Sequence, residues 1–153
     1  MCKTVHENYM REALAEARAA AEIGEVPVGA VVVLDGEIVG RGHNTTETEH
    51  DPTCHAEMNA LRDASQRLGR LRLNGCDMYV TCEPCAMCAG AIVLARITRL
   101  FVGTPDPKAG ACGSLRNVVC DERLNHRVEL TTGVLQEECA AELKIFFKAL
   151  RNK

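Results

Sequence analysis

The stretch Thr81–Ala91, TCEPCAMCAGA, decides how the rest of the chain is interpreted. Its cysteines, Cys85 and Cys88, stand three residues apart, directly after Glu83 and Pro84. A proline at the first helical position fixes φ and gives up only an N–H that has no partner there, so the sequence predicts a helix beginning at about Pro84. Both cysteines then share one face of the first turn, where the helix dipole favours the thiolate form that binds zinc. This stretch therefore predicts two ligands of a metal site, Cys85 and Cys88.

A second segment, CHAEMNAL, supplies the simplest third ligand. His55 sits where another helix is predicted to begin, and Glu57 follows two residues later. Three protein ligands leave the fourth position of a tetrahedral zinc for water, which is typical of catalytic sites. The alternative is a closed structural site that recruits Cys82 or Cys54 as its fourth ligand. Such a site has no use for Glu57, so the combination favours catalysis.

The pattern His-x-Glu followed by Pro-Cys-x-x-Cys is typical of zinc-dependent nucleobase deaminases. The chain also resembles the bacterial tRNA adenosine deaminases (TadA family) over about Tyr9 to Arg151, in the segments VPVGAVVV, HAEMNALR, TCEPCAMCAGAIVLARI, DPKAGACGSL, LNHRVEL and GVLQEECAAELKIFF. The resemblance implies one Zn²⁺ per chain, held by His55, Cys85 and Cys88. It implies hydrolysis of adenosine to inosine at the wobble position of tRNA anticodons, with Glu57 carrying the proton for a zinc-bound water that attacks the purine ring.

The same resemblance implies further site residues. Asn44 matches the residue that hydrogen-bonds the target base, and Pro27 and Val28 match the pocket wall. Asp106 and Lys108 match the loop that meets the RNA. By residue type alone, Asn44 is equally a turn residue and the loop is equally an ordinary surface loop. The resemblance also implies a homodimer, and it implies that a basic last helix lies close to the tRNA anticodon stem-loop; the basic residues are Lys144, Lys148, Arg151 and Lys153.

Composition sets limits on these readings. A chain of 153 residues, 46% hydrophobic and without a long apolar run, predicts one soluble domain over residues 1–153, cytoplasmic and without a membrane partner. Nine cysteines are an odd number, and no secretion signal is present, so reduced thiols are expected. Small buried apolar residues are the expectation for Cys2, Cys54, Cys76, Cys112, Cys120 and Cys139. A net charge of −3 means that any RNA contact must come from a few local cations.

Periodicity and turn residues predict the order of the elements. An amphipathic first helix ends at Gly24, and the last helix carries an apolar stripe. A β-α-β unit makes its two strands parallel, whereas a hairpin is antiparallel, so the sheet is mixed. The predicted fold is α/β, a three-layer α/β/α arrangement with a five-stranded mixed sheet, and the resemblance implies the cytidine-deaminase-like version of it. After the first helix the predicted elements are strands 28–34 and 37–42, a loop 43–53, a helix from about 55 to 69, strand 76–81, a helix 84–95, strand 98–103, a short helical piece 115–119, strand 127–131 and a helix 135–150.

Two rival functions remain open at this point. The same zinc chemistry can act on a free base or nucleotide of the guanine or cytosine type, which would have no need of the loop 106–113 or of a basic last helix for RNA. A zinc-stabilised binding module without catalysis is the rival from another class, and Glu57 counts against it.

Overall fold

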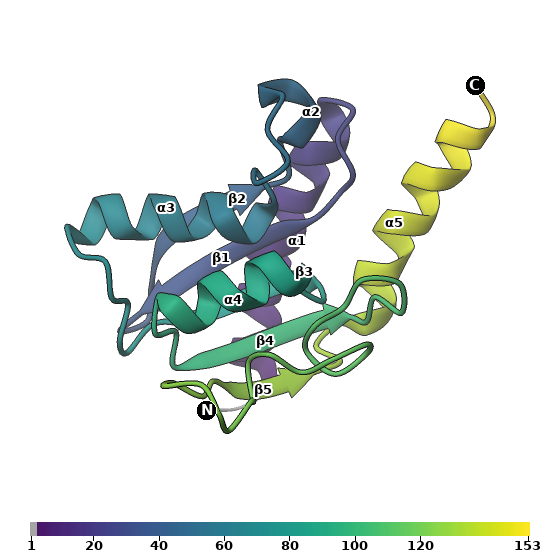
Figure 1. Ribbon diagram of the computed structural model, residues 1–153. Coiled ribbons are helices and arrows are strands. Elements are labelled where there is room, and N and C mark those ends of the chain that lie inside the picture. The colour runs from purple at the N-terminus through teal and green to yellow at the C-terminus, as the bar shows by residue number, and fades with distance from the viewer. Residues whose placement is uncertain (1–2) are drawn as a thin grey trace.

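The computed structural model describes residues 3–153, whose strands form one five-stranded sheet in the order β2-β1-β3-β4-β5. Strand β1 is antiparallel to both β2 and β3, whereas β3, β4 and β5 run parallel (Figure 1). The prediction of a mixed five-stranded sheet is therefore confirmed. The strand bounds are β1 Gly29–Leu34, β2 Glu37–His43, β3 Asp77–Cys82, β4 Arg99–Thr104 and β5 Glu129–Thr132.

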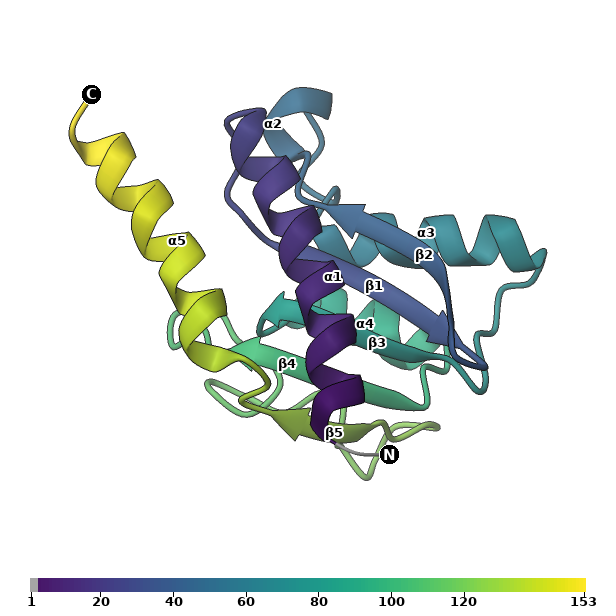
Figure 2. The same cartoon turned by 180° about the vertical axis from the view of Figure 1, so that it is seen from behind.

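Helices cover both faces of the sheet, as Figures 1 and 2 show from opposite sides. Helices α3 and α4 lie on one face, and α1 and α5 lie on the other, which confirms the α/β/α layers. Successive side chains of a strand point to opposite faces of the sheet. Val32 and Met78 therefore pack under α3 and α4, while Val31 and Tyr79 pack under α1. The helix bounds are α1 Lys3–Glu22, α2 Thr46–Glu49, α3 Ala56–Leu68, α4 Ala86–Leu94 and α5 Gln136–Arg151.

A close approach of α3 to β2 brings the start of that helix to the edge of the sheet. A Cβ atom added at Gly42 would lie 2.4 Å from both Ala56 O and Ala60 N. Only glycine allows the backbones of strand and helix to meet at this distance. Because Gly42 is the next-to-last residue of β2 and Ala56 begins α3, the packing places His55 near the end of β2.

Helix α4 begins two residues later than predicted. Cys85 is its N-cap in an extended conformation, with φ −74° and ψ 178°, and Pro84 lies outside the helix. Pro84 O accepts a hydrogen bond from Ala111 N–H at 2.8 Å, so this carbonyl serves a distant loop and not the first helical turn. The prediction of a helix start at Pro84 was wrong for this reason.

Two further segments differ from the prediction. Residues 115–119 form turns, because Val118 N–H donates to Ala111 O at 2.8 Å and Gly113 N–H to Arg116 O at 2.9 Å, and helical bonds are not made. The predicted loop 43–53 contains the short helix α2. Its free N–H groups at Glu47 and Thr48 donate to the carboxylate of Glu25, at 3.3 and 2.7 Å. The partner of α2, Glu25, is distant in sequence.

Helix α5 leaves the sheet after its first turns and projects away from it (Figure 2). Cys139 is the one residue of its apolar stripe that is buried, whereas Phe147 and Leu150 are 40% and 53% exposed. The eight cysteines of the described residues are free thiols, and the prediction for Cys2 lies outside those residues. Within residues 3–153, every helix is too short or too polar to cross a bilayer.

Candidate metal centre and substrate pocket

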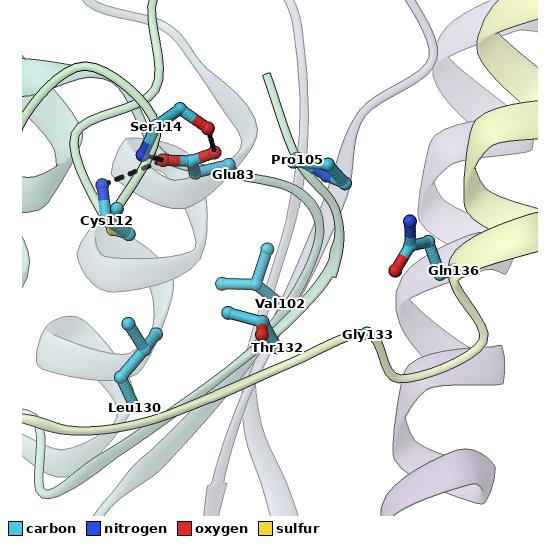
Figure 3. A pocket seen from close by; sticks show the side chains of 10 residues that line it. Glu83, Val102, Pro105, Cys112, Ser114, Leu130, Thr132, Gly133 and Gln136 are labelled. Carbon is cyan, nitrogen blue, oxygen red and sulfur yellow. Dashed lines mark hydrogen bonds between the residues drawn. The ribbon is translucent and has the colours of Figure 1, made fainter. Parts of the chain in front are cut away.

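The turn between β3 and α4 carries both motif cysteines and is held against β4. Glu83 N–H donates to Thr104 O at 2.9 Å, and Pro84 O accepts from Ala111 N–H. The side chain of Glu83 points toward the loop that follows β4, where it meets Ser114 (Figure 3). The turn is thus fixed by its own backbone and by one carboxylate.

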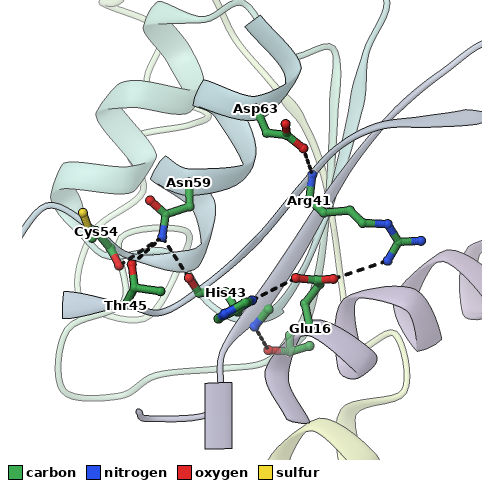
Figure 4. A network of polar contacts seen from close by, with 9 residues as sticks. Glu16, Arg41, His43, Thr45, Cys54, Asn59 and Asp63 are labelled. Carbon is green, nitrogen blue, oxygen red and sulfur yellow. Dashed lines mark hydrogen bonds and ion pairs between the residues drawn. The ribbon is translucent and has the colours of Figure 1, made fainter. Parts of the chain in front are cut away.

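Asn59, one turn into α3, fixes the opposite wall. Its amide donates to His43 O at 2.8 Å and to Thr45 Oγ1 at 3.0 Å, and it lies 3.5 Å from Cys54 O (Figure 4). These contacts connect the end of β2 with the residue that precedes His55. One side chain therefore sets the position of the histidine relative to the sheet.

His55, Cys85 and Cys88 meet between these two walls. His55 is the N-cap of α3 and Cys85 the N-cap of α4, and each has an extended backbone that turns its side chain across the helix end. His55 Nδ1 lies 3.6 Å from Cys85 Sγ and 3.5 Å from Cys88 Sγ. All three donor atoms lie within 4.8 Å of one another. In the described residues no other group of His, Cys, Asp or Glu side chains converges in this way.

The geometry of the cluster fits zinc. With Zn–S near 2.3 Å and Zn–N near 2.05 Å, a tetrahedral angle separates sulfur from nitrogen by about 3.6 Å. The two Nδ1–Sγ distances of 3.6 and 3.5 Å agree with that edge length. Two thiolates and an imidazole are also a donor set that zinc prefers. Three ligands on the protein leave one position open.

Electrostatics prepares Cys85 to act as a thiolate. Hydrogen bonds from Cys88 and then from His55 lower the pKa of Cys85 to about 3. The hydrogen bond to Cys85 in turn raises the pKa of Cys88. The lowered pKa of Cys85 favours its thiolate, the form that binds a metal cation.

The closed structural alternative required Cys82 or Cys54 as a fourth ligand. Neither belongs to the cluster of converging donor atoms in the described residues. Burial raises the pKa of Cys82 to about 12, which keeps it a neutral thiol. Cys54 lies 3.9 Å from Arg62 Nη1, away from the other two cysteines. The geometry therefore favours an open site.

Glu57 lies in the first turn of α3 and is only 3% exposed. Burial raises the pKa of Glu57 to about 7, because the low-dielectric surroundings disfavour the charged form. A carboxyl group with this pKa can both accept and release a proton near neutral pH. It is therefore suited to general acid–base work beside the metal.

A pocket of about 320 Å³ opens next to the cluster, and it is lined by His55, Glu57 and Cys85. Of the predicted wall residues, Val28 lines this pocket, but the buried Pro27 does not. The other lining residues are Val26, Asn44, Thr46, Ala56, Cys82, Glu83, Asp106 and Ala109.

Asn44 is 9% exposed and acts as a turn residue at the edge of the pocket. Its Oδ1 accepts from Thr46 N–H at 3.3 Å, as a turn residue does, and its Nδ2 donates to Val26 O at 3.4 Å. The same side chain also lines the pocket, so its second N–H remains available to a ligand.

Asp106 and Lys108 are separated by the structure. Asp106 lines the pocket, and its Oδ1 accepts from Lys108 N–H at 3.0 Å. The Lys108 side chain instead lines a second hollow of about 440 Å³, shared with residues of α5. The α5 residues in it are Leu143, Lys144, Phe147 and Arg151. A cation of the loop and two cations of α5 thus surround one exposed aromatic ring.

Comparison with known proteins agrees with this site. Residues 3–104 match the family described as the cytidine and deoxycytidylate deaminase zinc-binding region. The chain is 51% identical over 150 residues to a tRNA-specific adenosine deaminase of Bacillus subtilis, covering 98% of this chain and 93% of the relative. A solved structure from a study of A-to-I editing by tRNA:A34 deaminases at the wobble position of transfer RNA is 46% identical, with a TM-score of 0.86, covering 89% of this chain and 99% of the other.

A guanine deaminase from Bacillus subtilis is more distant. It is 34% identical with a TM-score of 0.66, covering 97% of this chain and 94% of the other. The zinc prediction is confirmed by the matched family and by the donor cluster. The chain therefore belongs to the zinc-binding cytidine and deoxycytidylate deaminase family, and within it to the tRNA-specific adenosine deaminases.

Proposed function

We propose that this enzyme hydrolyses adenosine to inosine at the wobble position of a tRNA anticodon. The observation that carries the proposal is the open three-ligand cluster of His55, Cys85 and Cys88, with the buried Glu57 beside it at the wall of one pocket. The choice of substrate is supported by the relatives at 51% and 46% identity, which are described as tRNA adenosine deaminases.

Zinc held by His55, Cys85 and Cys88 would supply an activated water as the nucleophile for C6 of adenine. Glu57 would take a proton from the attacking water and pass it to a ring nitrogen, and a second transfer would release the amine as ammonia. Its pKa of about 7 suits both directions of transfer. We assign Asn44 to a hydrogen bond with the base and Val28 to the apolar wall. The product is a ring carbonyl plus ammonia, so water and substrate atoms balance.

The hollow between the loop and α5 supports RNA as the substrate. Lys108, Lys144 and Arg151 surround it, and Phe147 is 40% exposed within it. Phosphates bind such cations, and an unpaired base stacks on an exposed ring. Because the chain carries a net charge of −3, this local group is where RNA affinity must arise. The proposal therefore assigns RNA binding to the basic residues of α5, for which a free-base enzyme has no need.

We further propose a cytoplasmic homodimer. A tRNA substrate implies the cytoplasm. Leu71 and Leu94 are 77% and 72% exposed and offer apolar surface that a second copy could cover. Sedimentation at micromolar concentration, with and without Leu94→Glu, measures this directly.

The decisive experiment compares an anticodon stem-loop, the same sequence fully paired, and free adenosine, cytidine, guanosine and guanine. An anticodon loop leaves its bases unpaired, so turning one into the pocket costs little compared with the few kcal/mol of a duplex. The expected result is inosine in the stem-loop, little in the duplex and almost none from free adenosine, because contacts remote from the ring supply the orienting energy.

Turnover of free guanine or a free nucleoside, with the stem-loop untouched, would assign the chain to the small-molecule deaminases. The guanine deaminase at 34% identity shows that the fold accommodates such a substrate. Val28 and Asn44, which line the pocket, would then be assigned to contacts with the free base.

A further inference from the structure

Glu83 is a buried acid for which the chemistry described above has no use. It stands between the last residue of β3 and Pro84, two residues before Cys85, and is 6% exposed. Within residues 3–153, no lysine, arginine or histidine forms an ion pair with it. Burying a carboxylate is costly unless other donors satisfy it, so its partners show what it does.

All four hydrogen bonds that the Glu83 carboxylate accepts come from one loop. Oε1 accepts from Asp106 N–H at 3.0 Å and from Ser114 Oγ–H at 2.5 Å. Oε2 accepts from Cys112 N–H at 2.9 Å and from Ser114 N–H at 3.1 Å. Figure 3 shows the carboxylate between Cys112 and Ser114. The donors span nine positions of the chain, so a single side chain gathers both ends of the loop.

The loop is also shaped to fit the carboxylate. A Cβ atom added at Gly110 would lie 2.3 Å from Glu83 Cδ and Oε2, so any other residue there would displace the acid. Asp106 continues the chain of contacts, since its Oδ1 accepts from Lys108 N–H and from Ala109 N–H at 3.3 Å. The position of Lys108 therefore depends on Asp106, and the position of Asp106 depends on Glu83.

We infer that Glu83 is the positioning residue that fixes the substrate loop, residues 105–114, to the turn that holds Cys85. The carboxylate touches neither the ligand cluster nor the Lys108 hollow through its own hydrogen bonds. It acts through Asp106, which lines the pocket, and through the backbone that carries Lys108 toward α5. The inference deepens the proposed function and rests on it where it takes this loop to meet RNA.

Glu83→Gln is the sharpest test, because it keeps the shape and replaces one acceptor oxygen with an NH₂ group. Whichever way the amide turns, its NH₂ would face at least one backbone N–H donor, so at least one hydrogen bond to the loop is lost. The expected result is one zinc per chain, faster hydrogen exchange confined to residues 104–115, and a KM for the stem-loop raised about tenfold or more, the size of one lost charge-assisted bond. The kcat stays within a few-fold of the wild-type value.

Ser114→Ala is the graded variant, since it removes only the hydroxyl donor, and it should give a smaller change in the same two measurements. Asp77→Asn is the matched control, a buried acid that is 8% exposed at the other end of β3. It should lower the melting temperature while leaving KM and the exchange of residues 104–115 unchanged.

Two results would overturn the inference: hydrogen exchange that becomes faster throughout the Glu83→Gln variant, or a KM for the stem-loop that equals the wild-type value. Glu83 would then be a general structural residue. Zinc content and loop exchange are measured without RNA. If the wild type proves inactive on the stem-loop, the proposed function fails, while the exchange pattern still decides whether Glu83 holds the loop.

Discussion

The two ends of the parallel pair β3 and β4 use buried polar side chains in opposite ways. At the amino end, Asp77 accepts two hydrogen bonds from Arg99, at 3.1 and 2.5 Å, directly across the strand pair. Tyr79 stacks on Phe101 with ring centroids 4.5 Å apart. The carboxylate of Asp77 is thus satisfied by a residue on the next strand.

The carboxyl end leaves its polar groups facing a hollow. Cys82 and Glu83 line the pocket there, together with the metal cluster and Glu57. Asp77 and Glu57 are almost equally buried, at 8% and 3%. Burial raises the pKa of Glu57 to about 7. Asp77, paired with Arg99, stabilises the fold, whereas the raised pKa of Glu57 suits it to carry protons.

The largest expected effect separates two cysteines at the carboxyl end. Cys85→Ala should lose zinc and with it all measurable deamination, because two remaining ligands hold the metal poorly. Cys82→Ala should keep one zinc per chain, since Cys82 is outside the cluster. Metal analysis of the two purified variants checks this. Loss of zinc from Cys82→Ala would restore the closed structural site.

The next effect concerns protons and not metal. Glu57→Gln should retain zinc and RNA affinity while its kcat falls by about 10²- to 10⁴-fold, the usual contribution of a general base. Single-turnover deamination of a stem-loop by metal-replete variant protein measures it. Asp77→Asn, the equally buried acid at the amino end, serves as the control and should keep its kcat. Near-normal turnover of Glu57→Gln would remove this residue from the mechanism.

The sequence predicted correctly those features that depend on residues close together in the chain, such as helix ends and turns. Gly69 ends α3 with φ 66°, as predicted from glycine at a helix end. Asp35 and Gly36, with φ of 50° and 81°, form the predicted two-residue turn between β1 and β2. The zinc cluster was predictable because cysteine spacing and a histidine at a helix start are both visible in the sequence.

The features that were missed depend on contacts between distant residues. Helix α2 is held by hydrogen bonds to Glu25, some twenty positions earlier in the chain. The sequence of segment 43–53 alone therefore did not lead to a helix prediction. Pro27 and Val28 were both expected in the pocket wall, but of these two only Val28 lines the pocket. Similarly, the apolar stripe of α5 predicts a helix. It does not show that the helix extends beyond the sheet, which leaves Phe147 and Leu150 exposed.

A smaller effect is expected from the cations beyond the carboxyl end. Neutralising Lys108, Lys144 or Arg151 singly should weaken stem-loop binding several-fold and lower the slope of log K against log salt by less than about one per contact. Titrations at several salt concentrations measure both quantities. Because the chain is acidic overall, the wild-type slope should itself be shallow. A steep wild-type slope, unaffected by these changes, would place the RNA on another surface.

The smallest effect belongs to the amino end and tests whether that end is structural alone. His6 lies there with Nδ1 2.7 Å from Tyr79 Oη, and its ring stacks on Phe101 at 4.3 Å. Burial, and then the charge of Arg99, lower the pKa of His6, while Asp77 opposes them. The unfolded chain therefore binds this proton at a higher pH than the folded protein does. The stability that neutral His6 contributes is complete above its ordinary pKa of about 6.5 and is lost as the pH falls from there through the lowered pKa of the folded state.

His6→Phe keeps an aromatic ring on Phe101 and removes the titrating group. Its melting temperature should therefore fall less than that of the wild type between about pH 7.5 and pH 5, although at pH 7.5 the variant lacks the contact with Tyr79. Arg99 and Asp77 are present in both proteins, so their own titration cancels in the difference. A gap between the two melting temperatures that does not change with pH would show that the pKa of His6 is not lowered. A change in the KM of His6→Phe for the stem-loop at pH 7.5 would contradict the distinction between the two ends of β3 and β4. The amino end would then be coupled to the substrate pocket.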